Sequence, residues 1–294
     1  MSDSPIYFVA EASSNHQQDL SRALALVESA AQCGFDAVKF QLFSINDLFA
    51  PDILARSDEH SARSAWELPL EFIPKLAQRA HDLGLEFSCT PFSLTAVEQL
   101  VPHVDFLKVA SYELLWDALI RECAQSGLPL VLSTGMAGIE EVDHAVQVAI
   151  NAGCRDLTLL HCVSAYPTPT HEANLAAIKT LRERTGLPVG WSDHTNDPAV
   201  IQRAVHRWGA SFVEMHLDLD GNGAEFAPGH CWLPATATSL IAGIHRGLLA
   251  DGHSRKEPSP SEIPDLMWRA DPSDGLRPML DERKRWEDGA LSQP

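Results

Sequence analysis

The chain has 294 residues and a formal net charge of −18, from 22 basic and 40 acidic residues. It contains no long run of lysine or arginine, so we expect no nucleic-acid partner. No stretch approaches the roughly 18 apolar residues of a membrane span, and the N-terminus, MSDSP, does not resemble a secretory signal. We therefore expect a cytoplasmic protein with no membrane partner. Six cysteines without a CxxC pair predict free thiols.

Eight short apolar runs rich in β-branched residues recur along the chain, and most are followed by a stretch with helical periodicity. The runs occupy residues 6–11, 36–41, 85–90, 105–111, 129–134, 156–162, 188–194 and 211–216. This alternation predicts one α/β domain over residues 1–250, a (β/α)₈ or TIM barrel. Catalytic groups in such barrels collect where the strands end.

The intervening segments carry helix signals of their own. Residues 19–33 place apolar side chains three and four positions apart, with Asp19 as a plausible N-cap and Gly34 just past the end. Similar patterns predict helices over residues 70–83, 114–125, 139–152, 174–184 and 198–208.

Two segments depart from this pattern. Residues 43–68 predict a long connection, and long loops inside compact domains are often lids. Residues 251–294 are rich in proline, serine and charge, which predicts a C-terminal extended tail wrapping the barrel. Trp268 and Trp286 argue against a fully disordered tail.

Lysines near two strand ends predict an anion site. Lys39 and Lys108 are expected to point into the barrel mouth, because the outer face of each strand packs on apolar helices. Two lysines in one mouth repel each other unless an anion lies between them, and a small substrate with carboxylate and phosphate supplies that charge. The alternative is that each lysine pairs with a nearby acid such as Glu11 or Glu113. Hydroxyls at or just after five strand ends support the anion site: Thr90, Ser111, Ser133, Ser164 and Ser192.

Histidines at the last two strand ends predict a metal site. His194 and His216 end neighbouring strands about 4.8 Å apart, so both imidazoles could bind one ion. Two histidines leave positions for water and substrate, which suits catalytic Mn²⁺, Fe²⁺ or Co²⁺ better than structural Zn²⁺. Two alternatives stay open. His161 and His230 could complete a tighter zinc site with Cys162 or Cys231, or the histidines could be buried and bonded to the backbone.

An ordered series of motifs resembles the barrel domain of the sialic acid synthase (N-acetylneuraminate synthase) family. The matching segments are VAEASSNH (9–16), AVKFQ (37–41), TPF (90–92), LKVASYE (107–113), LSTGM (132–136), LLHC with YPTP (159–169), GWSDHT (190–195) and VEMH (213–216). This family condenses phosphoenolpyruvate with an aldehyde sugar to make a 2-keto-3-deoxy sugar acid and phosphate. The resemblance implies the same transferase activity, with an aldose such as N-acetylmannosamine or a related sugar as acceptor.

The resemblance also implies roles for the matched residues. The phosphoenolpyruvate pocket would be lined by Lys39, Thr90, Lys108, Ser111, Ser133, Ser164 and Ser192. His194 and His216 would hold a divalent metal, with Mn²⁺ favoured over Mg²⁺, Co²⁺ or Fe²⁺. Gln41, Glu113 and Tyr166 would face the sugar, and Glu11 or Glu113 would act as acid or base. A homodimer is expected by resemblance alone.

Three departures from the family pattern concern the acceptor side. Val163 and Ser164 stand where the family usually has threonine and asparagine. The usual GPD motif after the eighth strand is replaced within residues 218–234, where Glu225 or His230 could take the place of the acidic residue. The antifreeze-like domain, which in the family supplies an arginine to the partner's sugar site, is expected to be missing. The tail, residues 251–294, is then expected to cap the active site in part, in cis or across a dimer, with Arg269 and Arg277 as candidate substitutes.

Two other functions remain as alternatives. One is a metal-dependent aldolase or another 2-keto-3-deoxy acid synthase on the same barrel, and release of phosphate from phosphoenolpyruvate separates synthase from aldolase. The other is a non-catalytic sugar-phosphate-binding protein. The presence of both lysines, both strand-end histidines and Glu113 argues against such a degenerate barrel, since a binder would not need the metal pair.

Overall fold

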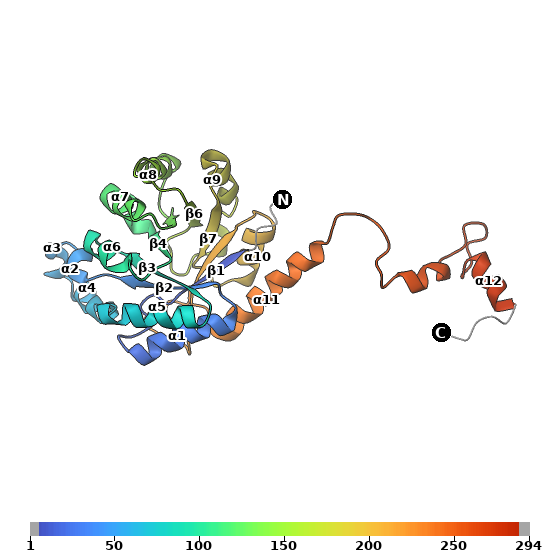
Figure 1. Ribbon diagram of the computed structural model, residues 1–294, viewed down its shortest axis with the longest axis horizontal. Helices are drawn as coiled ribbons and strands as arrows, with labels where there is room; N and C mark the ends of the chain where they lie inside the picture. Colours follow the sequence, from blue (N-terminus) through green and yellow to red (C-terminus); the bar gives the residue numbers. More distant parts are fainter. Residues whose placement is uncertain (1–5, 288–294) are drawn as a thin grey trace. The chain divides into compact units, whose positions relative to one another are not determined.

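The computed structural model describes residues 6–287 and shows eight parallel strands closed into a barrel in sequence order. The first strand pairs with the last, and helices surround the strands (Figure 1). The strands are β1 (Tyr7–Glu11), β2 (Ala37–Leu42), β3 (Glu86–Pro91), β4 (Phe106–Val109), β5 (Leu130–Ser133), β6 (Leu157–Cys162), β7 (Val189–Asp193) and β8 (Phe212–His216). The predicted TIM barrel is confirmed.

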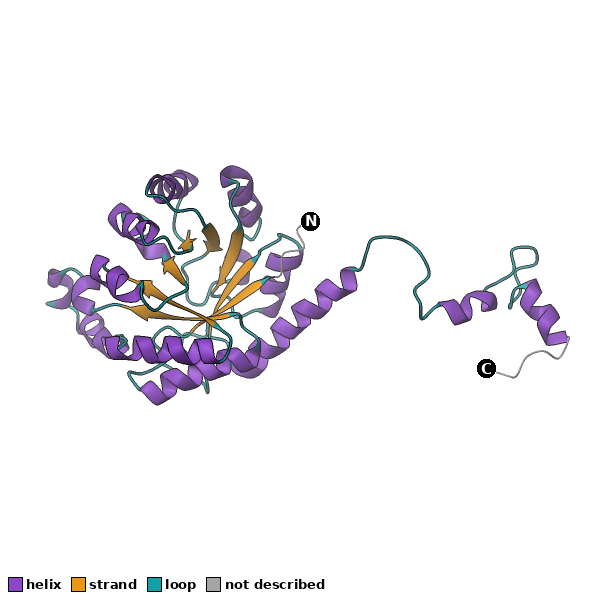
Figure 2. Cartoon of the chain, in the orientation of Figure 1, coloured by secondary structure: helices purple, strands orange, loops and turns teal. Residues whose placement is uncertain are grey.

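Most helices between the strands lie where periodicity predicts them (Figure 2). The helices that follow β1 to β8 are α1 (Leu20–Cys33), α5 (Ile73–Asp82), α6 (Leu94–Leu100), α7 (Asp117–Gln125), α8 (Ile139–Asn151), α9 (Ala177–Thr185), α10 (Pro198–His206) and α11 (Pro234–Asp251). Sequence reasoning missed α6, which is too short for a clear period. It also missed α11, although Ala237, Leu240, Ile241 and Ile244 repeat at helical spacing and are buried.

The caps of α1 show how the sequence sets an element's ends. The Asp19 carboxylate accepts hydrogen bonds from the backbone N–H groups of Ser21 and Arg22. Gly34 ends the helix with φ of 85°, a left-handed conformation that glycine adopts without strain. Both ends match the prediction.

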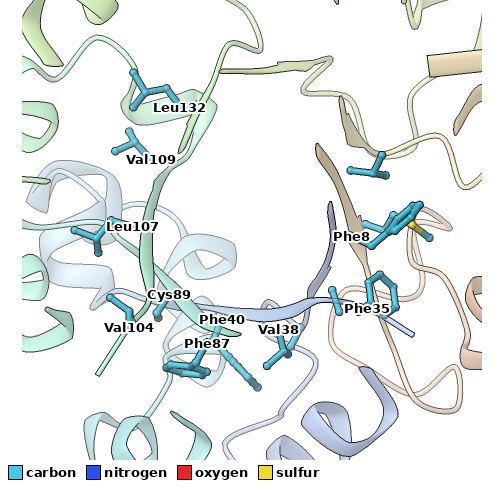
Figure 3. Packing of buried hydrophobic residues seen from close by; sticks show 14 of the residues in the cluster. Phe8, Phe35, Val38, Phe40, Phe87, Cys89, Val104, Leu107, Val109 and Leu132 are labelled. Carbon is cyan, nitrogen blue, oxygen red and sulfur yellow. The ribbon is translucent and has the colours of Figure 1, made fainter. Parts of the chain in front are cut away.

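Alternation along the strands divides the side chains between two environments. Outward residues such as Phe40, Phe87 and Leu107 pack toward the helices (Figure 3). A separate buried cluster fills the barrel interior and consists of Val9, Ala37, Phe106, Val131, Leu160 and Phe212. Gly190 makes room for this cluster, because a Cβ there would lie 2.2 Å from the Phe212 carbonyl oxygen.

Two residues beyond each member of the interior cluster, the next inward side chain is polar or a thiol. These residues are Glu11, Lys39, Lys108, Ser133, Cys162 and Glu214. All of them are at most 5 % exposed, so the chemistry of the mouth begins directly above the apolar interior. The alternation of side chains between the two faces of each strand therefore points these polar residues into the barrel mouth.

The connection between β2 and α5 is not a plain loop. It contains α2 (Ile45–Leu48), α3 (Pro51–Leu54), α4 (Asp58–Ala62) and the 3₁₀ turns η1 (Arg63–Trp66) and η2 (Leu70–Phe72). Ser44 and Ser57 cap two of these helices through their hydroxyls. The long connection expected from the sequence is present, and it contains short helices because local caps nucleate helices that a periodicity search overlooks.

The chain divides into two compact units, Met1–Gly247 and Leu248–Pro294. Within the second unit, η5 (Ile263–Trp268) and α12 (Leu280–Glu287) form, and the rings of Trp268 and Trp286 meet edge to face with centroids 5.8 Å apart. The Asp271 carboxylate accepts from the Leu280 backbone N–H at 2.9 Å. This segment has local structure of its own beyond an extended tail.

Two further sequence expectations concern the cysteines and membrane-spanning helices. All six cysteines are free, as predicted. Within residues 6–287, no helix has both the length and the apolar character needed to cross a membrane.

Candidate active site

Two lysines and two glutamates form a buried ionic layer at the barrel mouth. Lys39 Nζ contacts Glu11 Oε2, lies 3.7 Å from Glu214 Oε2 and donates to Thr90 Oγ1 at 3.0 Å. Lys108 Nζ lies 3.3 Å from Glu214 Oε1. Glu214 therefore stands between the lysines and neutralises part of the charge of each.

The charges of this layer stabilise one another. Burial alone would raise the pKa of Glu214, but Lys108 and Lys39 outweigh burial and lower that pKa to about 2. Burial lowers the pKa of Lys39 to about 8, so its ammonium group is still charged at neutral pH. For Lys39, the alternative of pairing with a nearby acid is correct, and that acid is Glu11. Among the described residues, the ion-pair partner of Lys108 is Glu214, not Glu113.

Glu214 was missed as a site residue by sequence reasoning, although a usable signal was present. It lies two positions before His216 in VEMH, so both side chains must point the same way. Glu214 also contacts Ser192 in this layer, because the Ser192 hydroxyl donates to Glu214 Oε1 at 3.2 Å.

Hydroxyls with spare hydrogen-bonding capacity gather beside the lysines. Across residues 6–287, Ser133 Oγ and Ser164 Oγ are buried without a hydrogen-bond partner, while Ser111 Oγ accepts from the Gly135 N–H at 3.0 Å. A Cβ at Gly135 would lie 2.3 Å from Ser164 Oγ and 2.7 Å from Ser111 Oγ, so only glycine fits there. Buried polar atoms normally find partners, and these donors suit the oxygens of an anionic ligand.

Glu113 lies near this cluster on the 3₁₀ turn η3 (Ser111–Glu113) after β4. Burial raises the pKa of Glu113 to about 7, against the opposing pull of Lys108. Its Oε2 atom has no hydrogen-bond partner in the described part of the chain. A carboxyl group that titrates near neutrality is suited to take up or release a proton.

Three histidine rings and a tyrosine ring cluster on the other side of the mouth. The ring centroids of His216 and His230 lie 4.7 Å apart, and His194 lies 5.2 Å from His216 and 6.2 Å from His230. The Tyr166 ring is 4.1 Å from His194 and 5.1 Å from His230.

His230 reaches this cluster because the chain after β8 folds back on the strand end. The Trp232 N–H donates to the His216 carbonyl oxygen at 2.7 Å, and the Asp218 N–H donates to the Trp232 carbonyl oxygen at 2.9 Å. The Asn15 side chain donates to the Leu217 carbonyl oxygen at 2.9 Å, which ties the loop to the end of β1.

Glu225, on the same loop, braces His216. Its Oε2 atom lies 3.2 Å from His216 Nδ1, and its Oε1 atom accepts from the Ser13 hydroxyl at 2.6 Å. Gln41 Nε2 donates to the same hydroxyl at 2.8 Å, so Gln41 and Glu225 belong to one hydrogen-bonded chain. Burial lowers the pKa of His216 to about 4 despite Glu225, which leaves the neutral imidazole that binds metals.

The donor set fits a divalent cation. The ligand atoms of His216, His230 and Cys231 all lie within 4.8 Å of one another, and His230 Nδ1 is buried without a partner in the described structure. His194 Nδ1 donates to the Val163 carbonyl oxygen at 2.8 Å, so the lone pair of the neutral ring lies on Nε2. His230 therefore joins the expected pair, His194 and His216, in one cluster of rings.

The alternative that placed His161 in a zinc site is wrong. His161 points out of the barrel, where Nε2 bonds to the Ala173 carbonyl oxygen at 3.0 Å and the ring lies 5.3 Å from Trp191. Odd and even positions of β6 face opposite sides, so Cys162 is at the mouth and His161 is not. Cys162 Sγ lies 3.9 Å from His194 Nδ1.

Comparison with known proteins identifies the family of this chain. A model of the NeuB family matches residues 26–256. The chain belongs to the NeuB family. It is 34% identical over 280 residues to the N,N'-diacetyllegionaminic acid synthase of Legionella pneumophila, covering 88% of this chain and 76% of the relative. It is also 37% identical over 263 residues to an uncharacterised protein of Methanocaldococcus jannaschii, covering 88% and 75%.

Solved structures show the same likeness. The N-acetylneuraminic acid synthetase of Leptospira borgpetersenii, crystallised with citrate, superposes with a TM-score of 0.79 at 30% identity, covering 92% of this chain and 93% of that one. As a NeuB family member, the chain is an enzyme of the sialic acid synthase type, a phosphoenolpyruvate-utilising transferase that forms a carbon–carbon bond. The NeuB family condenses phosphoenolpyruvate with a sugar and is generally dependent on a divalent metal.

Proposed function

We propose that this enzyme condenses phosphoenolpyruvate with an aldose of the N-acetylmannosamine type, giving a 2-keto-3-deoxy sugar acid and phosphate. The main support for the proposal is that residues suited to bind an anion and residues suited to bind a cation lie in the same barrel mouth. Buried lysines and unpartnered hydroxyls lie on one side, and a histidine cluster suited to a cation lies on the other.

Lys39 and Lys108 are assigned to the carboxylate and phosphate of phosphoenolpyruvate. An ammonium group has three N–H donors. Lys39 already meets Glu11, Glu214 and Thr90, whereas Lys108 meets one acid among the described residues. Lys108 therefore has donors to spare for the substrate. The hydroxyls assigned to the same pocket are those of Thr90, Ser111, Ser133, Ser164 and Ser192.

Glu113 is assigned to the proton of the water that adds during the reaction. Carbon 3 of phosphoenolpyruvate attacks the aldehyde carbon, water adds to the cation left at carbon 2, and phosphate leaves from the tetrahedral intermediate. The Glu113 carboxyl group titrates near pH 7 and has a free oxygen. Glu11, the other candidate, is engaged by Lys39 and by the Ser13 N–H at 2.7 Å, which makes it the poorer choice.

His194 and His216 are assigned to the divalent metal, with His230 as a candidate third ligand, and Glu225, Gln41 and Tyr166 are assigned to the sugar side. When bound, a divalent metal supplies Lewis-acid polarisation of the sugar aldehyde. We expect His194→Ala and His216→Ala each to lose most of the bound metal, as measured by metal analysis after dialysis. Full retention of metal in both variants would refute this metal site, and loss of metal in His230→Ala would show that His230 is a third ligand.

The function is tested by incubating the protein with a divalent metal, phosphoenolpyruvate and a panel of aldoses that includes N-acetylmannosamine. We expect phosphate release that depends on one class of aldose, with one 2-keto-3-deoxy acid formed per phosphate. Phosphate release without an aldose would indicate a phosphatase, and condensation without phosphate release would indicate an aldolase. In Lys108→Met, loss of one buried charge-assisted contact is expected to weaken phosphoenolpyruvate binding about 10- to 150-fold.

We also propose that the enzyme is cytoplasmic and, because its net charge is −18, that it binds no nucleic acid. On family resemblance alone we propose that it is a homodimer. Light scattering of the full chain tests the dimer, and a monomer at assay concentrations would refute it.

A further inference from the structure

One buried serine joins two residues that are assigned to the sugar side. Ser13 lies two positions after the end of β1 and is 1 % exposed. Its hydroxyl donates to Glu225 Oε1 at 2.6 Å and accepts from Gln41 Nε2 at 2.8 Å. Ser13 therefore links β2 to the loop that follows β8.

Backbone contacts fix the place of this hydroxyl. The Ser13 N–H donates to Glu11 Oε1 at 2.7 Å, and the Ala12 N–H donates to the Lys39 carbonyl oxygen at 2.8 Å. Ser13 has φ of 47°, in the left-handed region that residues other than glycine rarely adopt. Residues in such conformations persist where surrounding contacts hold them, and they cluster at functional sites. Contacts to β1 and β2 therefore hold the Ser13 side chain between its two partners.

The two hydrogen bonds of Ser13 fix the orientation of the Gln41 amide. A serine hydroxyl has one proton and two lone pairs, and an ionised carboxylate can only accept. Because the Ser13 proton is donated to Glu225, Ser13 can only accept from Gln41. The Gln41 amide must therefore turn its NH₂ group to Ser13, which leaves its carbonyl oxygen to face another donor.

We propose that Ser13 is a positioning residue that sets the specificity for the aldose, by turning the Gln41 carbonyl oxygen toward a hydrogen-bond donor of the sugar. That donor is an O–H or an acetamido N–H, because an amide oxygen can only accept. The proposal rests on the function proposed above, in which Gln41 contacts the sugar. Within residues 6–287 the Ser13 hydroxyl bonds to Gln41 and Glu225 and to neither lysine of the ionic layer, so phosphoenolpyruvate binding should not depend on it.

Steady-state kinetics of the full chain test the proposal, with the aldose that supports the fastest phosphate release. Ser13→Gly removes the hydroxyl and suits the left-handed backbone, so the variant should fold. We expect the KM for the aldose to rise about tenfold, as for one lost hydrogen bond, and the KM for phosphoenolpyruvate to stay unchanged. Ser14→Ala is the matched control and should keep both KM values, since Ser14 is also 1 % exposed and its hydroxyl has no partner in the described part of the chain.

A double variant tests whether Ser13 acts through Gln41. If it does, Ser13→Gly should add little to the rise in aldose KM that Gln41→Ala causes alone, because the positioned group is already gone. Among deoxy and deacetamido analogues of the aldose, at least one should be discriminated by the parent and no longer by Ser13→Gly, and that analogue identifies the donor. Effects that multiply in the double variant, an unchanged aldose KM in Ser13→Gly, or an equal rise in Ser14→Ala would each overturn the proposal.

NMR of the protein labelled with ¹⁵N-glutamine measures the Gln41 orientation without turnover. Gln41→Ala identifies the side-chain NH₂ signal, whose hydrogen exchange should be faster in Ser13→Gly than in the parent and in Ser14→Ala. Equal exchange in the parent and Ser13→Gly would overturn the positioning role. Slow exchange in a parent that shows no aldose-dependent phosphate release would keep the Gln41 orientation and refute the proposed reaction. Aldose-dependent phosphate release with an unchanged aldose KM in Ser13→Gly would keep the reaction and refute the role of Ser13.

Discussion

Glu214 is the counter-ion on which the buried lysines depend, so Glu214→Gln should destabilise the barrel. The substitution keeps the shape of the side chain and removes its charge. It leaves Lys108 without an ion-pair partner among residues 6–287, while Lys39 keeps Glu11. Because the glutamine oxygen still accepts a hydrogen bond from Lys108, we expect the lower end of the effect seen when one member of a buried pair is removed.

That effect is about 3 kcal/mol in the free energy of unfolding, from a range of roughly 3–5 kcal/mol. For a domain of this size it corresponds to a fall in Tm of about 6–12 °C. The unfolding of Glu214→Gln and of the parent protein should be measured near pH 7. The pKa of Glu214 falls from 4.5 to about 2 on folding, so its stabilisation is complete above pH 4.5 and is lost as the pH drops toward 2.

A double-mutant cycle with Lys108→Met identifies the partner. If Glu214 balances Lys108, removing the lysine as well relieves the unpaired charge, and the double variant should be more stable than Glu214→Gln alone. We expect a coupling energy of about 1–3 kcal/mol from denaturant unfolding. Additive effects of the two substitutions, or a Glu214→Gln variant as stable as the parent, would refute the electrostatic argument.

Three further predictions concern catalysis. Glu113→Gln should remove the limb near pH 7 on which kcat/KM rises as the carboxylate forms, and survival of that limb would assign the proton to another group. Gly135→Ala sets a methyl group 2.3 Å from Ser164 Oγ and should raise the KM for phosphoenolpyruvate about tenfold or more, whereas Gly138→Ala, with neighbours at 3.7 Å, should leave it unchanged. If residues 251–294 cap the site, their deletion should impair aldose use more than phosphoenolpyruvate binding, and unchanged aldose kinetics in a folded truncation would exclude this role.

The barrel and the composition of its mouth could be predicted from the sequence because both depend on short-range periodicity. A strand reverses its facing at every residue, so Lys39 two positions after Ala37 must lie above the interior cluster. The same parity would have identified Glu214 from His216, and it excludes His161, which follows the inward Leu160 by one residue. Helix caps such as Asp19 are equally local.

Only the tertiary structure decided which charged and metal-binding groups meet. The sharing of Glu214 by two lysines depends on β8, β2 and β4 being brought around one closed ring. The arrival of His230 and Cys231 beside His216 depends on a loop tied to Asn15, whose side chain bonds to Leu217, 202 residues away in the sequence. No local pattern encodes such contacts, because their geometry comes from chain closure and from hydrogen bonds between segments far apart in sequence.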